Sequence, residues 1–371
     1  MKQETGLFAL RALMNWDHDT AEREFKRLSF LAEYKYDEYA DFIAGSRFLE
    51  NLVRWLQQFD STTPRAVAYN FIARRLIFVT NSEMERLVEQ FFPRTLFYDT
   101  LNDVAQTLNC KQHEVLLRDD GKLEFEREIR KTLIVGMSDG ARVDVLRRLN
   151  VGRLVNDQVL VSMDADQSRW KSAQRKLAAS PIIEDPAALF NRVYLIDDFT
   201  ASGTTLCRRA GNEWDGKLFR FLGRFRDEAG RTISADATVG IHHFLGTEQA
   251  KEQLEGRIAT AGKDHRDAKG FWFRVDPRLS FGHLIQDDVR IMKGADGDDD
   301  AFLQLCDDHY DKSIEKPEHD QVELQHGYKG GALPLVLQHN TPNNSFTLLH
   351  KESTGADGPV MRALFRRRDR H

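Results

Sequence analysis

Hydrophobic positions in the first part of the chain recur at helical spacing. Two such sets are Phe25, Leu28, Leu31 and Ala32, and then Phe48, Leu49, Leu52, Trp55 and Leu56. This spacing places apolar side chains along one face of a helix. Pro64 suits the first turn of a further helix, and Asn81 or Ser82 suits the N-cap of another. The pattern predicts an all-helical N-terminal domain over residues 1–120, in which we identify no site chemistry.

From about residue 130 the pattern changes to short apolar runs separated by polar segments. The runs predict strands at 131–137, 158–163, 192–198, 217–225 and 237–246. Polar segments with helical spacing follow several of them, for example at 138–150 and 247–261. Short strands that alternate with helices indicate an α/β domain with a largely parallel sheet. We assign this core to residues 121–275 and a mixed α+β appendage to residues 276–371.

Composition adds limits to this picture. A chain of 371 residues exceeds one typical domain, and its formal net charge of −5 argues against a broad nucleic-acid-binding surface. Three scattered cysteines, Cys110, Cys207 and Cys306, suggest reduced thiols rather than a disulfide framework. The first residues lack the apolar region of a signal peptide, and no run approaches the ~20 apolar residues that span a bilayer. We therefore expect a cytoplasmic protein that does not enter the membrane.

The segment 193–206, VYLIDDFTASGTTL, carries the clearest candidate chemistry. Ligands of a parallel α/β sheet bind beyond the carboxyl ends of the strands, where Asp197 and Asp198 are expected. The residues after them predict a tight loop around Gly203 and a helix at 203–212. Backbone amides and small hydroxyl side chains there would form a phosphate cradle. The two acids would repel phosphate, so they suit ribose hydroxyls or hydrated Mg²⁺ instead. A simple cap and turn, with Ser202 as the cap, is the structural alternative.

These residues resemble the PRPP (phosphoribosyl pyrophosphate) motif of type I phosphoribosyltransferases. The resemblance runs from Val193 through Asp198 and then from Thr200 to Thr205. It implies that Asp197 and Asp198 act in catalysis, hold the ribose hydroxyls and bind Mg²⁺ as the cofactor. It implies a phosphoribose-binding loop of Thr200, Ala201, Ser202, Gly203, Thr204 and Thr205. The chain departs from the motif at Tyr194, Phe199 and Thr200, which replace small aliphatic residues, and at Ala201, which lacks a common hydroxyl.

An earlier strand, loop and helix resembles the pyrophosphate loop of the same family. The resemblance implies a pyrophosphate loop of Ser138, Asp139, Gly140, Ala141 and Arg142. An acid at position 139 weakens anion binding by repulsion, and Arg142 could compensate for it. An ordinary turn between a strand and a helix would show the same pattern.

The polar segment 164–180 lies where the family often has a mobile loop that closes over the substrate. Cations on such a lid stabilise the charge of the departing pyrophosphate, and we assign this catalytic role to Arg169 and Lys171. A solvated amphipathic helix explains the segment equally well.

The C-terminal segment 331–350 resembles the end of phosphoribosyltransferase-like proteins from bacterial conflict systems. This resemblance implies a hood over the acceptor, with His339, Asn340 and Asn344 near the site. The same residues would also make a good turn between two strands, which we favour. The basic tail at 362–371 is interpreted as frayed or as partner-binding.

Three functional hypotheses follow. The first is a type I phosphoribosyltransferase-like enzyme that moves 5-phosphoribose from PRPP, or a related phosphoribosyl nucleotide, to a nitrogen nucleophile with release of pyrophosphate. The second is a non-catalytic PRPP or nucleotide sensor, or a regulatory subunit, which Asp139 and Ala201 favour. The third is an effector of a bacterial antiphage defence system, acting with a protein partner through the helical N-terminal domain or the basic tail. The resemblance also makes a homodimer an expectation. The sequence identifies no general base and no acceptor.

Overall fold

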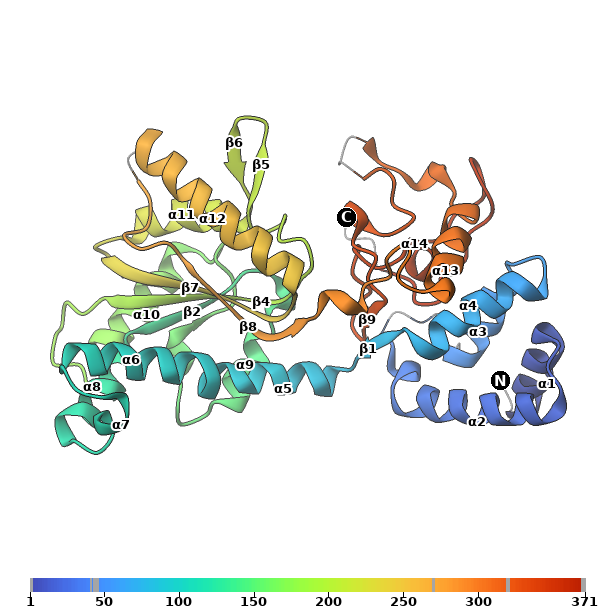
Figure 1. Cartoon of the computed structure of the whole chain (residues 1–371). Coiled ribbons are helices and arrows are strands. Elements are labelled where there is room, and N and C mark those ends of the chain that lie inside the picture. The colour runs from blue at the N-terminus through green and yellow to red at the C-terminus, as the bar shows by residue number, and fades with distance from the viewer. Residues whose placement is uncertain (1–2, 41, 43–46, 269–270, 318–320, 368–371) are drawn as a thin grey trace. The chain divides into compact units, whose positions relative to one another are not determined.

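The computed structural model describes residues 3–40, 42, 47–268, 271–317 and 321–367. The chain forms two compact units, which are coloured by residue number in Figure 1. Unit 1 combines Met1–Glu83 with Gln286–His371, and unit 2 comprises Met84–Ile285. We expected three parts, with boundaries near residues 120 and 275. The contacts divide the chain differently, because residues 84–120 pack with the α/β core and the two ends of the chain share another core.

Unit 2 is built on a five-stranded sheet in which every neighbouring pair is parallel. The strands are β2 (Thr132–Gly136), β3 (Val159–Leu160), β4 (Phe190–Thr200), β7 (Ile233–Thr247) and β8 (Arg278–Ile285), in the spatial order β3-β2-β4-β7-β8. The central strands read as continuous apolar runs because both of their faces are buried. The predicted α/β class with a largely parallel sheet is therefore confirmed.

Helices cover both faces of this sheet, as Figure 1 shows. One face packs against α10 (Gln167–Ala178), α11 (Lys217–Glu228) and α12 (Glu248–Ala268). The opposite side carries α5 (Asn81–Phe91), α6 (Phe97–Thr107), α7 (Gln112–Val115), α8 (Asp119–Arg130) and α9 (Val143–Leu149). Crossovers between parallel strands are right-handed, so α9 and α10 lie on opposite faces because the chain reverses direction between them.

Two predicted elements of the core are wrong. The expected strand at 217–225 is helix α11, since Leu218, Phe221, Leu222 and Phe225 follow helical spacing and are all buried. The expected helix at 203–212 is a turn followed by the hairpin of β5 (Arg208–Ala210) and β6 (Glu213–Asp215). Gly211 and Asn212 form its two-residue turn, and Gly-Asn is a sequence that favours such hairpins.

Unit 1 contains α1 (Gln3–Met14), α2 (His18–Tyr34), α3 (Phe48–Leu56), α4 (Thr62–Arg74), β1 (Ile77–Val79), α13 (Gly297–Asp308), β9 (Leu335–Leu337) and α14 (Thr347–His350). Its N-terminal part is not all-helical as predicted, because β1 pairs in parallel with β9 from the other end of the chain. Short 3₁₀ segments complete both units, at Tyr36–Glu38, Asp139–Ala141, Asn156–Gln158, Asp287–Val289, Lys312–Ile314 and Tyr328–Gly330, and a π-helical turn lies at Phe92–Leu96.

The C-terminal residues contribute to the core of unit 1. Leu364 and Phe365 are fully buried, and the ring of Phe365 stacks on Phe48 with centroids 5.8 Å apart. The predicted fraying therefore does not apply to these positions, because their apolar side chains fill the core. Residues 368–371 of the basic tail lie outside the described residues. Across the described ranges, no helix combines the length and the apolarity needed to cross a membrane.

Candidate functional site

The strand order of unit 2 reverses direction between β2 and β4. The chain runs from β2 to β3 on one side and then returns across β2 to β4 on the other side. The connections that leave the carboxyl ends of β2 and β4 therefore diverge, which is the usual ligand site of a doubly wound sheet. Of the two predicted loops, 138–142 follows β2, and 200–205 begins at Thr200, the last residue of β4.

Asp197 is a buried acid at this point, with an exposed fraction of 4%. One of its carboxylate oxygens accepts a hydrogen bond from the hydroxyl of Ser138, in the loop after β2. The other oxygen pairs with the ammonium of Lys217, the first residue of α11. Burial raises the pKa of Asp197, and the charge of Asp198 raises it further, while Lys217 opposes both effects.

Asp198 lies half-buried beside the loop after β2. Its carboxylate accepts a hydrogen bond from the amide of Phe199 at 2.8 Å. A Cβ atom on Gly140 would lie 2.6 Å from its Oδ2, so only glycine allows this close approach of loop and acid. The two predicted loops are thus brought together around the pair of acids.

Neighbouring elements hold the loop after β4 in place. Gly203 has a φ of +67°, and a Cβ there would meet Leu254 of α12 at 2.4 Å. Arg257 of α12 donates to the carbonyl oxygens of Ser202 at 2.9 Å and of Cys207 at 3.3 Å. The amide of Lys217 donates to the carbonyl of Thr205 at 3.0 Å, which closes the hairpin insertion. The loop conformation is therefore determined by α11 and α12 rather than by a helix of its own.

Several backbone amides in the two loops have no hydrogen-bond acceptor among the described residues. Among the hydrogen bonds of the described residues, none uses the amides of Ser138 to Gly140 or of Ser202 to Thr205 as donors. The hydroxyl groups of Ser202 and Thr204 lie 3.0 Å apart and add further donors, while Thr205 is exposed and Thr200 and Ala201 are buried. Successive amides at a turn with a positive φ are suited to anions.

The two charged residues of the first loop, Asp139 and Arg142, have different surroundings. Asp139 is exposed, so solvent screens its repulsion of an anion. Ala141 is buried, and Arg142 has a left-handed φ of +50°. Burial lowers the pKa of Arg142, and the nearby carboxylate of Asp198 opposes this shift. The cation of this loop thus lies close enough to the site to interact with one of its acids.

The predicted Mg²⁺ site does not fit Asp197. Both of its carboxylate oxygens are engaged inside the protein, one by Ser138 and one by Lys217. Within the described residues, no three or more His, Cys, Asp or Glu side chains form a group that could hold a metal ion. Divalent magnesium needs oxygen ligands in near-octahedral geometry, which a carboxylate already paired with an ammonium does not offer.

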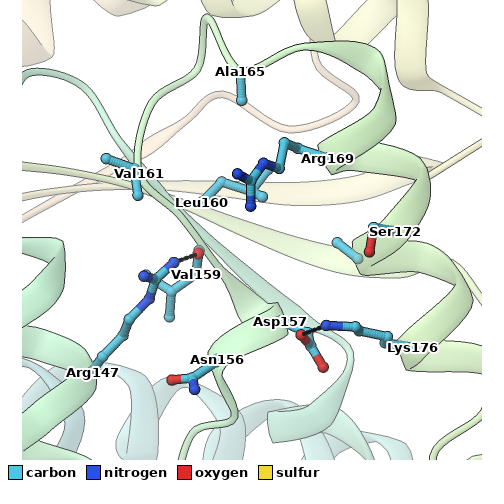
Figure 2. A pocket seen from close by; sticks show the side chains of 11 residues that line it. Arg147, Asn156, Asp157, Val159, Leu160, Val161, Ala165, Arg169, Ser172 and Lys176 are labelled. Atoms are coloured by element: carbon cyan, nitrogen blue, oxygen red, sulfur yellow. Dashed lines mark hydrogen bonds and ion pairs between the residues drawn. The ribbon is translucent and has the colours of Figure 1, made fainter.

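Arg169 and Lys171 lie on α10, whose residues Trp170, Ala173 and Leu177 are buried in the core. Both cations are exposed, so the segment has the form of an amphipathic helix. Arg169 lines a pocket of about 270 Å³ beside the edge strand β3, shown in Figure 2. In that pocket Lys176 is paired with Asp157, and Arg147 donates to the carbonyl of Val159. No described interaction links Arg169 or Lys171 with Asp197 or Asp198, and their catalytic role stays a prediction.

Three residues of the site were missed in the sequence. Lys217 lies 12 residues and Arg257 lies 52 residues after Thr205, where the motif ends, and nothing in their local sequence marks them. His243 is the direct neighbour of Asp197 across β4 and β7. Burial, together with the charge of Lys217, lowers the pKa of His243 to about 3. The sequence signal for His243 was the pair His242-His243 within an otherwise apolar run. His339, Asn340 and Asn344 belong to unit 1, so their predicted place near the site stays a prediction.

Comparisons with known proteins show the family of this chain. A family model named PRTase-CE matches residues 52–367, which is most of the chain. Neither the curated proteins nor the solved structures contain a match. The parallel α/β core is the one expected from the resemblance to phosphoribosyltransferases. The chain belongs to PRTase-CE, a phosphoribosyltransferase-type family.

Proposed function

We propose that unit 2 binds the phosphoribosyl group of PRPP, or of a related nucleotide, between the carboxyl ends of β2 and β4. The observation that carries this proposal is the pair of loops with unused amides on either side of Asp197 and Asp198. Amides attract the phosphate groups at the two ends of such a ligand, and a carboxylate between them accepts hydrogen bonds from ribose hydroxyls.

Each part of the site has a separate role in this proposal. The loop Thr200 to Thr205 holds the 5′-phosphate, and Asp198 accepts hydrogen bonds from the ribose hydroxyls. The amides of Ser138 to Gly140 and the charge of Arg142 hold the pyrophosphate. Asp197 keeps Ser138 and Lys217 in position, since its carboxylate contacts both.

The reaction we propose is transfer of the 5-phosphoribosyl group to a nitrogen nucleophile. The bond between C1 of the ribose and the pyrophosphate oxygen breaks, and a bond from C1 to nitrogen forms. Negative charge grows on the departing pyrophosphate, and preorganised amides beside Arg142 stabilise it more in the transition state than in the ground state. Orientation of the two reactants supplies the remaining acceleration.

Calorimetric titration of the full chain with PRPP tests the binding step. Wild type is expected to bind, and Asp198→Asn is expected to bind about tenfold or more weakly, which corresponds to about 1.4 kcal/mol. Asp227→Asn, an exposed acid on α11, is the matched control with the same change of charge. If Asp198→Asn binds PRPP as tightly as wild type, the Asp198 carboxylate does not contact the ligand. A wild type that binds no PRPP would overturn the proposal.

A second candidate is a non-catalytic PRPP or nucleotide sensor. The engagement of Asp197 by Lys217 favours it, because this acid is held by the protein itself. Release of pyrophosphate from PRPP in the presence of nitrogen nucleophiles separates the two functions: an enzyme releases it and a sensor does not. The sequence resemblance also supports two further proposals, a defence role with a protein partner and the formation of a homodimer.

A further inference from the structure

The position of Lys217 is set by the backbone around it. Its amide donates to Thr205 at 3.0 Å, and the next amide, of Leu218, donates to Leu206 at 3.1 Å. Gly216 before it has a φ of +121°, and a Cβ there would meet the carbonyl oxygen of Leu206 at 2.4 Å. The start of α11 is therefore held against the loop of Thr200 to Thr205, called the phosphate loop below, and the side chain of Lys217 extends from there to Asp197.

The ion pair of Lys217 and Asp197 is largely removed from water. The side chains are 13% and 6% exposed, respectively. A buried carboxylate next to a second one, Asp198, is costly unless a cation balances the charge. In a site of paired acids a divalent metal ion often supplies that cation. In this chain an ammonium group that belongs to the protein supplies it.

The ammonium can also contact a ligand. It carries three N–H donors, and among the described residues Asp197 is its one hydrogen-bond partner. The remaining donors lie at the same end of the sheet as the phosphate loop, since Lys217 and Thr205 are joined by a backbone hydrogen bond. The ammonium can thus donate a hydrogen bond to a ligand oxygen whose charge a metal ion would otherwise balance.

From these contacts we infer that Lys217 replaces a divalent cation in the candidate phosphoribose site, so that the phosphoribosyl group binds without Mg²⁺. The inference rests on the proposed function and deepens it. It identifies Lys217 as a residue that sets the cation requirement of the site.

The test uses ribose 5-phosphate, because the pyrophosphate of PRPP itself chelates Mg²⁺ and would hide the effect. Calorimetric titration of the full chain is run once in EDTA and once in millimolar MgCl₂. Wild type is expected to give the same Kd in both buffers. Lys217→Met is expected to lose about tenfold or more in EDTA and to regain affinity with Mg²⁺. Lys217→Arg should remain independent of the metal, because it keeps a cation beside Asp197.

Lys263→Met, which removes an exposed lysine from α12, is the matched control and should behave as wild type. Circular dichroism and thermal unfolding establish that each variant is folded. If Lys217→Met does not fold, the comparison of wild type in the two buffers decides the question.

A second readout needs no phosphoribosyl ligand. Paramagnetic resonance of added Mn²⁺ is expected to show no bound ion in wild type and one in Lys217→Met, which Asp197→Asn in the same background removes. Wild-type binding of ribose 5-phosphate only with Mg²⁺, or a bound Mn²⁺ that Asp197→Asn removes from wild type, would overturn the inference and leave the proposed function intact. Failure to bind ribose 5-phosphate and PRPP in either buffer would overturn the proposed function and the inference with it.

Discussion

The guanidinium of Arg192 on β4 lies 2.6 Å from the carboxylate of Asp103 on α6. The same guanidinium donates to the hydroxyl of Thr100 at 2.6 Å, and its side chain is only 6% exposed. One turn along, the hydroxyl of Tyr194 donates to Asp99 of α6. Arg192 and Tyr194, which are two residues apart on β4 and share one face of the sheet, thus attach α6 to that face. Helices α10 to α12 cover the opposite face. This arrangement holds in place the strand that carries the candidate site.

Arg192→Met is expected to destabilise unit 2 by about 2–4 kcal/mol, because it leaves Asp103 and Thr100 without their buried partner. Arg226→Met, at an exposed position of α11, should change the free energy of unfolding by less than about 0.5 kcal/mol. Hydrogen exchange in peptides from β4 and α6 measures the change. Equal protection in the two variants would show that the ion pair does not stabilise the unit.

Gly203→Ala is expected to displace the loop of Thr200 to Thr205, since the new Cβ would collide with Leu254 and the φ of +67° disfavours alanine. We predict loss of about tenfold or more in affinity for PRPP. Gly211→Ala is a matched control, because its φ is +62° but no atom lies within 4 Å of the added Cβ. It shares the backbone strain of about 1 kcal/mol without the collision. Titration of both variants with PRPP should therefore separate them, and similar affinities would contradict the role of the contact.

Two buried histidines make the stability of unit 2 depend on pH. Burial is the main cause that lowers the pKa of both His242 and His243 to about 3. The neighbouring His243 contributes to the shift of His242, and the charge of Lys217 contributes to that of His243. An unfolded histidine has a pKa of about 6.5, so between these values the unfolded state binds more protons. Stability should fall as the pH drops below about 6.5, by up to about 1.4 kcal/mol per pH unit for each histidine.

In His242→Gln the unfolded state binds one proton fewer. The pH slope of the unfolding free energy between pH 4 and pH 6 is therefore expected to fall by about 1.4 kcal/mol per unit. His283→Gln, at an exposed position of β8, should keep the wild-type slope. Urea unfolding at several pH values measures both, and an unchanged slope in His242→Gln would contradict the buried neutral state.

In unit 1, Asp311 organises the segment that follows α14. Its buried carboxylate accepts hydrogen bonds from the amides of Ser313 at 3.0 Å, Gly355 at 3.0 Å and Asp357 at 2.9 Å. Burial alone would raise its pKa, but the hydrogen bonds outweigh this and hold the pKa well below its usual range. The stabilisation is present above the unfolded pKa of about 4 and is lost as the pH falls toward the folded value.

Asp311→Ala is expected to destabilise unit 1 by about 2–3 kcal/mol, because it removes the charged acceptor of three backbone amides. Asp308→Ala serves as control, at an exposed position three residues earlier. Hydrogen exchange of residues 352–358 at neutral pH should rise in the first variant alone. Protection equal to wild type would mean that these amides find other acceptors.

Local pattern was sufficient to predict some elements and insufficient for others. β2, β4 and β7 were predicted because strands buried on both faces appear as unbroken apolar runs. Helix α11 was mistaken for a strand because its five apolar residues lie within nine positions, where helical and alternating spacing are hard to separate. The hairpin of β5 and β6 was missed although Gly211-Asn212 is a turn signal.

The candidate site shows the same division. The two acids and the loop of Thr200 to Thr205 are contiguous in sequence, so one motif reveals them. Lys217, Arg257 and His243 join the site through the packing of α11, α12 and β7, which no local pattern encodes. The pairing of β1 with β9 was unpredictable for a related reason: its partners lie more than 250 residues apart in the chain.

The division of unit 1 between the two ends of the chain has a consequence for its synthesis. Its first segment leaves the ribosome about 200 residues before its second, because Met84–Ile285 is made in between. At roughly 5–20 residues per second this is a delay of about 10–40 s. During that time the apolar faces of α3 and α4, and the edge of β1, lack the partners that cover them in the finished protein. Unit 2, which is continuous, can fold first, so the nascent chain would carry a completed α/β core tethered to a segment that depends on chaperones or on rapid completion of translation.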